Sequence, residues 1–179
     1  MSESNQWVVD ASHSNAGFSV RHMMITNVRG EFQKLEGTVT WDPLHPEATK
    51  IEASVDVASI NTRDEKRDGH LKSADFFDVE KFPTITFKSK SAKAKGKEEL
   101  SVTGDLTIHG VTKEVVLEVE GPSAPAPDPW GNTRVGATAS TKIKRDDFGL
   151  TWNAALEAGG VLVGSEIKIT IDVSLIKQK

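Results

Sequence analysis

The side chains best suited to acid–base or metal chemistry are the five histidines, which stand at positions 13, 22, 45, 70 and 109. No two of them have the i, i+4 spacing of a helical zinc pair, and no His-x-His pair occurs. Cysteine is absent, which removes thiol nucleophiles and cysteine-based zinc sites. We therefore expect neither a metal nor a resident cofactor.

A short segment near the amino terminus contains the residue types of a hydrolase triad, Asp10, His13 and Ser14. Adjacency along the chain is not triad geometry, and no strand–turn–helix elbow surrounds Ser14. Hydrogen bonds from Asp and Ser side chains to the nearby backbone account for the same residues. The sequence thus predicts no catalytic site.

Composition and charge exclude several classes of protein. The chain has 179 residues, a formal charge of -4 and no long basic run, which argues against nucleic-acid binding. No stretch of 18 apolar residues exists, so we expect no stable membrane insertion. Residues 1–6 lack the features of a secretory signal, which predicts a cytoplasmic protein as written, or a periplasmic one if a signal was removed. The length fits a single domain, residues 1–179.

We expect strands to position the histidines and the other candidate side chains, because apolar and polar residues alternate along most of the chain. A strand of this pattern has one dry face, which is typical of antiparallel sheets. About eight such strands must close into a barrel or stack as a sandwich to bury that face. The expected strands are 16–23, 28–41 (bent near Gly30 or Gly37), 51–57, 83–90, 100–108, 115–119, 133–145 and 167–175. Short helices are expected in the connections 62–80, with Asn61 or Thr62 as the N-cap, and 153–159.

Two polar side chains fall on the dry face of their strands. His22 shares the face of Phe18, and it is either a core histidine with one hydrogen bond or a contact for the polar end of a ligand. Arg145 also points inward, and a buried Arg needs a partner, which the adjacent Asp146 or Asp147 could supply.

Four ordered blocks resemble the YceI-like family of polyisoprenoid-binding proteins and together cover about residues 7–175. They read DASHS at 10–14 with FSVRH at 18–22 and GEF at 30–32, RDGHLKSADFFD at 67–78 with FPTITF at 82–87, GDLTIHGVTK at 104–113, and RDDFGLTW at 145–152 with VGSE at 163–166. The resemblance implies an all-β fold, an extended eight-stranded antiparallel lipocalin-like barrel. It also implies a homodimer whose apolar channel holds a polyprenyl phosphate, an isoprenoid quinone or a fatty-acid-type lipid, with no defined reaction and no metal.

Small residues on the apolar strand faces leave space for such a ligand, or for Trp and Phe side chains from facing strands. We expect the ligand to contact Phe18, Val20, His22, Met24, Phe32, Trp41, Phe87 and Trp152. The candidates for binding its head group are His13, Arg67, His70 and Arg145, of which Arg67 and His70 would alternatively hold the 62–80 segment to the barrel. The predicted function is to carry or sequester the lipid. The alternatives are an enzyme acting on such a lipid, with His13 or His22 as acid or base, and an interaction module whose barrel is filled by its own side chains.

Overall fold

The computed structural model describes residues 5–156 and 160–179 and consists mainly of antiparallel strands. The strands are β1 (Gln6–Val9), β2 (Asn15–His22), β3 (Thr26–Phe32), β4 (Leu35–Thr40), β5 (Lys50–Asp56), β6 (Ile60–Asn61), β7 (Thr84–Gly96), β8 (Glu99–Ile108), β9 (Val111–Glu120), β10 (Ala126–Pro127), β11 (Thr133–Lys144) and β12 (Val163–Lys177). The described residues also form one α-helix, α1 (Glu65–Lys72), and four short 3-10 helices, η1 (Ala11–His13), η2 (Pro46–Ala48), η3 (Val57–Ser59) and η4 (Arg145–Phe148).

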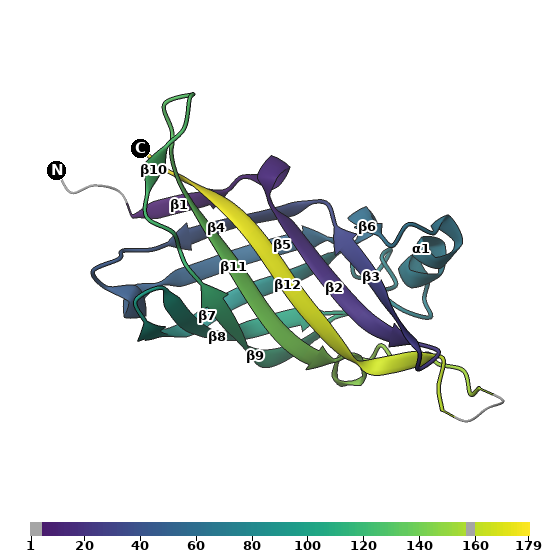
Figure 1. The fold of residues 1–179 in the computed structure, drawn as a ribbon. Coiled ribbons are helices and arrows are strands. Elements are labelled where there is room, and N and C mark those ends of the chain that lie inside the picture. Colours follow the sequence, from purple (N-terminus) through teal and green to yellow (C-terminus); the bar gives the residue numbers. More distant parts are fainter. Residues whose placement is uncertain (1–4, 157–159) are drawn as a thin grey trace.

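Eight strands close into a barrel in the order β11, β9, β8, β7, β5, β4, β1 and β12, and β12 pairs back onto β11 (Figure 1). Along its other edge, β12 pairs with β2 at residues 163–172 and with β1 at residues 175–177, so β1 and β2 act as two parts of one long strand. β3 pairs with β2 and with the short β6, and α1 lies beside β6 at that end of the barrel (Figure 1). The predicted eight-stranded antiparallel, lipocalin-like barrel is confirmed.

The expected strand 28–41 is divided, but not at a glycine. β3 ends at Phe32 and β4 begins at Leu35, because the amides of Gln33 and Lys34 donate to the backbone oxygen and side chain of Ser59 (3.4 and 3.1 Å) instead of to a neighbouring strand. Gly30 serves close packing: a Cβ there would lie 2.5 Å from the Phe18 ring. The predicted bend at Gly30 or Gly37 is therefore wrong.

The two predicted helical connections differ in outcome. α1 confirms a helix within 62–80, but its N-cap is Asp64, whose carboxylate accepts from the Arg67 amide (3.1 Å). In the second connection, residues 153–156 are not helical, and 157–159 lie outside the described residues. Asn153 instead pairs through its side-chain amide with both backbone groups of Val163 (2.8 and 3.0 Å).

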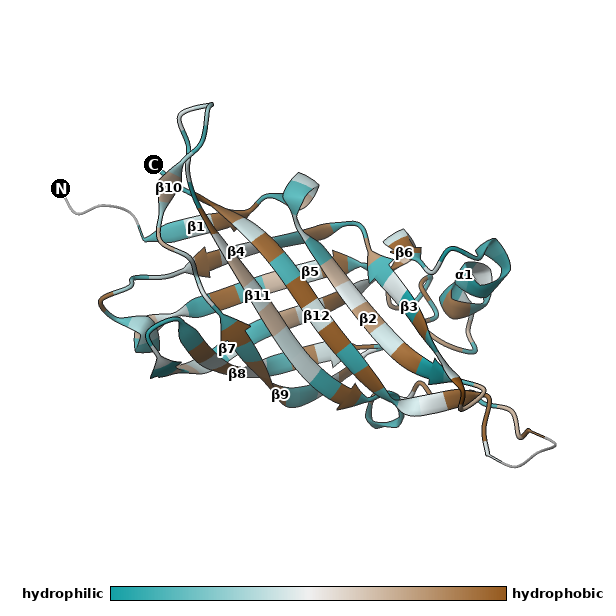
Figure 2. Cartoon of the chain, viewed as in Figure 1, coloured by the Kyte–Doolittle hydropathy of each residue, from teal (hydrophilic) through white to brown (hydrophobic). Residues whose placement is uncertain are grey.

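The barrel interior contains two hydrophobic clusters that fill it only in part. One surrounds Trp7 and Trp41, whose rings lie 5.9 Å apart, and the other surrounds Phe32 and Leu35. Figure 2 shows the alternation of apolar and polar residues along β11, β12 and β2 that turns one face of each strand inward. Across the described residues, no helix combines the length and apolar character needed to cross a bilayer.

Candidate functional site

Two adjoining cavities occupy the barrel, with volumes of about 130 Å³ and 170 Å³. They meet end to end, because six residues line both: Leu35, Ala53, Phe87, Leu106, Ile169 and Ile171. An apolar cavity of roughly 150 Å³ stays free of water and accepts small hydrocarbons. The interior therefore offers an elongated dry space, which we call the channel.

The first cavity lies toward Trp41 and is lined mainly by the inward faces of the strands. On β12, Ile169, Ile171, Val173 and Leu175 line it, while the residues between them are exposed or face outward. Ala137 and Ala139 on β11 also line it, and their small side chains leave its space unfilled.

Gly104 acts differently from these alanines. A Cβ at this position would lie 2.6 Å from the Phe87 ring and 2.6 Å from the backbone oxygen of Lys88. The missing side chain lets Phe87 lie across β8, where its ring lines both cavities. Of the small inward residues, the alanines thus leave space in the channel and Gly104 admits a facing aromatic ring.

The second cavity lies toward α1, where residues 71–77 cover the side of the barrel. Leu71, Phe76 and Phe77 all line this cavity. Phe77 packs edge-on against Phe32 (5.9 Å between ring centroids), and Phe76 packs against Trp152 (5.3 Å). These three lining residues were not predicted as ligand contacts, although the apolar pair Phe76–Phe77 inside a charged segment was a signal that could have identified them.

Arg145 is the charged side chain in the wall of the second cavity, and it is only 4% exposed. Its Nη1 donates to the carbonyls of Leu150 and Trp152 (2.6 and 2.9 Å), Nε donates to Gly164 (2.9 Å), and Nη2 donates to Val163 (3.3 Å). Burial lowers the pKa of the guanidinium below its ordinary value.

The partners of Arg145 differ from those expected. Asp146 and Asp147 are exposed, and neither forms an ion pair with Arg145 among the described residues. The guanidinium instead satisfies main-chain carbonyls of two segments that the sequence alone does not bring together. It fastens the 150–152 segment to the start of β12.

Half of the predicted site residues lie in the channel wall. Phe18, Val20, Phe32, Trp41, Phe87 and Arg145 line one or both cavities. His22, Met24 and Trp152 lie outside both linings, and Met24 is more than half exposed. Trp152 packs against Phe76, which itself lines the second cavity. Ligand contact stays a prediction for all of them.

The other head-group candidates are engaged elsewhere. Arg67 donates from Nε and Nη2 to the hydroxyl and carbonyl of the buried Thr62 (2.8 and 2.7 Å). His70 pairs with Asp75 (2.9 Å) and lies edge-on to the Trp152 ring (4.7 Å). Arg67 therefore braces the 62–80 segment internally, while the ring contact of His70 with Trp152 joins that segment to another part of the chain, as the alternative role predicts for His70.

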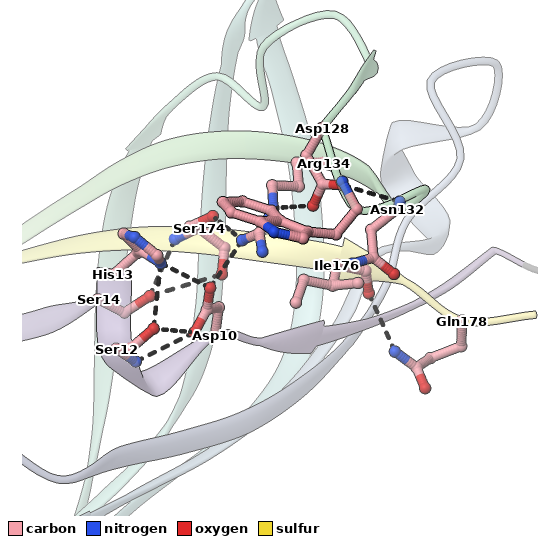
Figure 3. Close-up of polar contacts among 11 residues, drawn as sticks. Asp10, Ser12, His13, Ser14, Asp128, Asn132, Arg134, Ser174, Ile176 and Gln178 are labelled. Atoms are coloured by element: carbon pink, nitrogen blue, oxygen red, sulfur yellow. Dashed lines mark hydrogen bonds and ion pairs between the residues drawn. The ribbon is translucent and has the colours of Figure 1, made fainter.

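His13 belongs to a polar cluster at the break between β1 and β2 (Figure 3). Its Nδ1 contacts both Asp10 Oδ2 (2.8 Å) and Ser12 Oγ (3.1 Å). In a catalytic triad the carboxylate and the hydroxyl contact opposite ring nitrogens, so this arrangement cannot relay a proton between them. Neither cavity wall includes His13.

Arg134 is the centre of the same cluster. It donates to Asp10 (2.7 Å), to Asp128 (2.6 Å) and to Ser174 (3.2 Å). Its guanidinium is the main reason that the pKa of Asp10 lies far below the ordinary value. For Asp128, burial alone would raise the pKa, but the hydrogen bonds from Arg134 and from the Asn132 and Trp130 amides lower it to about 2. The cluster therefore fastens the broken strand to β11 and β12.

Within residues 5–156 and 160–179, no three His, Asp or Glu side chains are grouped in a way that could hold a metal ion. What the described residues offer is an apolar channel with one buried cation in its wall.

A protein-family model and several named proteins match this chain over most of its length. The family model of the YceI-like domain matches residues 7–175. Protein YceI of Salmonella newport is 36% identical over 170 residues, which cover 95% of this chain and 85% of that protein. A UPF0312 protein of Vibrio cholerae is 38% identical over 146 residues, which cover 80% of this chain and 77% of that protein.

Solved structures share the fold. A YceI protein of Campylobacter jejuni superposes with a TM-score of 0.74 at 32% identity, covering 89% of this chain and 90% of that one. BcnA of Burkholderia cenocepacia gives 0.79 at 24% identity, covering 93% and 98%. A polyisoprenoid-binding domain of Saccharophagus degradans gives 0.67 at 16% identity, covering 96% and 98%. With a barrel of this topology and a family match over nearly its whole length, the chain belongs to the YceI-like family.

Proposed function

We propose that this protein binds one long-chain amphiphilic lipid in its channel and carries or sequesters it without changing it chemically. The observation that carries this proposal is the pair of adjoining cavities with almost entirely apolar walls. The candidate ligands are a polyprenyl phosphate, an isoprenoid quinone and a fatty-acid-type lipid. The similarity in fold to a protein described as a polyisoprenoid-binding domain supports the first two.

The shape of the channel suits a chain better than a compact molecule. Residues from Val163 to Leu175 of β12 line it, a distance of about 40 Å along a strand at roughly 3.3 Å per residue. Burial contributes about 0.8 kcal/mol per methylene, so a long tail provides affinity with few polar contacts. Binding would then depend mainly on the tail.

We place the head group at the Arg145 end of the channel. Four of the five guanidinium N–H groups can be assigned to the four carbonyls, which leaves one for a ligand oxygen. The comparison that tests this placement uses a polyprenyl phosphate and the polyprenol of equal length. Equal affinity for the two would contradict a head-group contact while leaving tail binding intact.

Solvent extraction of the purified protein followed by mass spectrometry tests the proposal directly. The expected result is a co-purified long-chain lipid, together with saturable uptake of a quinone or polyprenyl phosphate by delipidated protein. Neither a bound lipid nor saturable uptake would contradict it.

A matched pair of variants on β11 connects binding with the channel. Ala139 lines the first cavity, while the next residue, Ser140, is exposed on the outer face. Ala139→Leu adds three carbons inside, and excluding about three ligand methylenes should weaken binding roughly 50-fold. Ser140→Leu adds a similar side chain outside and should leave affinity unchanged. Equal effects of the two substitutions would mean that the lipid binds elsewhere.

The assembly and the compartment are separate proposals. We keep the homodimer as the expected oligomeric state, and light scattering on the purified protein would distinguish it from a monomer. The cytoplasm and the periplasm are both kept as candidate compartments, and cell fractionation distinguishes them.

A further inference from the structure

The turn between β2 and β3 exposes three consecutive apolar side chains to solvent. Met23 is 44% exposed, Met24 56% and Ile25 68%. Val161, from the connection that precedes β12, is 41% exposed nearby, because the Met23 amide donates to the Leu162 carbonyl (2.7 Å). Met23, Met24, Ile25 and Val161 are called here the apolar tip.

The backbone of this turn makes its composition unusual. Met23 and Met24 have φ of 52° and 61°, and the Ile25 amide donates to the His22 carbonyl (3.2 Å), as in a type I′ turn. Asn-Gly is the sequence that such a turn favours, because both central residues need positive φ. Two large apolar residues are disfavoured here by backbone conformation and by exposure. Stability of the barrel therefore does not account for them.

The apolar tip lies at the α1 end of the channel. Val20, three residues before Met23, lines the second cavity, and so does Val163, which pairs with His22. The β2–β3 turn and the connection before β12 lie together at this end of the barrel (Figure 1). An object in contact with the tip would thus lie next to the end of the channel.

Basic side chains lie on the outer face of the strands that lead to this end of the barrel, β2, β3, β11 and β12. The exposed ones are Arg21, Arg29, Lys142, Lys144 and Lys168, which we call the basic collar. Strand pairing places three of them in one row across the sheet. Ser19 on β2 pairs with Arg29 on β3 and with Lys168 on β12, and Lys168 pairs with Lys142 on β11.

Beside the collar, the exposed acidic residues are Asp146, Asp147 and Glu166, so the five basic residues outnumber them on this face of the barrel. The 62–80 segment at the same end has exposed acidic residues of its own, Asp64, Glu65, Asp75 and Glu80. Within the described part of the chain, none of the five collar residues has a carboxylate within ion-pair distance. The collar is therefore available to an external anionic surface.

We infer that the apolar tip docks reversibly on a bilayer surface that contains anionic lipids. The tip side chains enter the interface between head groups and acyl chains, while the collar faces the lipid phosphates. The small tip supports peripheral contact rather than insertion. Docking goes beyond lipid binding in the channel and does not require the channel to be occupied.

Flotation of the purified full-length protein with vesicles tests the inference. We expect binding to vesicles of phosphatidylcholine plus phosphatidylglycerol, weaker binding to phosphatidylcholine alone, and a decrease as salt screens the collar. Lys168→Glu should weaken binding to the anionic vesicles several-fold. Failure of the wild-type protein to float with either vesicle would overturn the inference.

The decisive variant replaces Met23 and Met24 by Asn and Gly. This pair suits the turn, so thermal stability should stay the same or rise, while vesicle binding should fall at least tenfold. Leu44→Ser is the matched control, because Leu44 is 82% exposed in the β4–β5 loop at the opposite end of the barrel (Figure 1). Unchanged vesicle binding in the double variant, or an equal loss in the control, would contradict docking through the tip.

Lipid uptake measured in solution separates this inference from the proposed function. A Met23→Asn variant, which leaves the predicted ligand contact Met24 in place, should take up a quinone from solution as the wild-type protein does. Vesicle binding without any lipid uptake would contradict only the proposed function, and uptake without vesicle binding would contradict only the docking.

Discussion

Replacing Arg145 by Met should strongly destabilise the barrel, because the guanidinium supports two chain segments from a buried position. Leu150, Trp152 and Gly164 each lose the Arg145 donor to their carbonyl, whereas the Val163 carbonyl keeps the Asn153 amide. Methionine preserves much of the apolar stem, so the change removes mainly the hydrogen bonds and the charge.

The expected magnitude follows from these groups. A buried carbonyl left without a donor costs about 1–3 kcal/mol. Removing the cation also removes its own cost of burial, which offsets part of the loss. We therefore expect the free energy of unfolding to fall by about 3–5 kcal/mol. A chain of this length changes its Tm by about 2–4 °C per kcal/mol, which gives a decrease of roughly 6–20 °C.

Urea unfolding monitored by fluorescence of the four tryptophans is a suitable assay. Arg145→Lys should fall between the wild-type protein and Arg145→Met, since one ammonium group cannot reach all four carbonyls. Lys144→Met, at the exposed neighbouring position, should change stability by less than about 0.5 kcal/mol.

A loss below about 1 kcal/mol in Arg145→Met would refute this reasoning, because it would mean that desolvation of the cation cancels its hydrogen bonds. If that variant kept its stability but lost affinity for a polyprenyl phosphate, Arg145 would act mainly on the head group. A loss of stability with unchanged affinity for polyprenol would support the structural role.

Three further predictions concern the ion cluster, a close approach of two strands, and the 62–80 segment. The pKa of Asp128 is lowered to about 2 from 3.8, so its contribution to stability is complete above about pH 4 and is lost as pH falls toward 2. Arg134→Gln should therefore reduce the fall in Tm between about pH 4 and pH 2. The same fall as in the wild-type protein would contradict this prediction. Gly104→Ala should cost about 1–3 kcal/mol, because its Cβ meets backbone atoms of β7. Gly96→Ala, where a Cβ meets nothing within 4 Å, is the control in the same thermal melts. Arg67→Ala should lower unfolding free energy by about 1–3 kcal/mol without changing lipid affinity in a binding titration, and a selective loss of affinity would restore Arg67 as a head-group contact.

Several features of the barrel could be predicted because they depend on local pattern. Alternation determines which face of a strand each side chain occupies, and Phe18, Val20, Phe32 and Phe87 do line the channel as their parity indicates. Many strands with a single dry face must bury that face, which leaves a barrel or a sandwich, and the family resemblance then indicated the barrel.

Other features depended on partners distant in the chain. Ser59 divides β3 from β4 by accepting the amides between them, and no local pattern around Gln33 indicates this. Met24 follows the parity of His22, yet the turn begins before it and leaves it exposed.

By itself, the sequence thus determined the strand faces, the fold class and the family resemblance, because each of these follows from the order of residues along the chain. Only the tertiary structure decided that the barrel has unfilled space, that residues 71–77 cover its side, and that Arg145 binds carbonyls rather than a neighbouring carboxylate. The physical reason is that a cavity or a buried polar contact depends on how side chains from separate strands meet, and this is set by closure of the barrel.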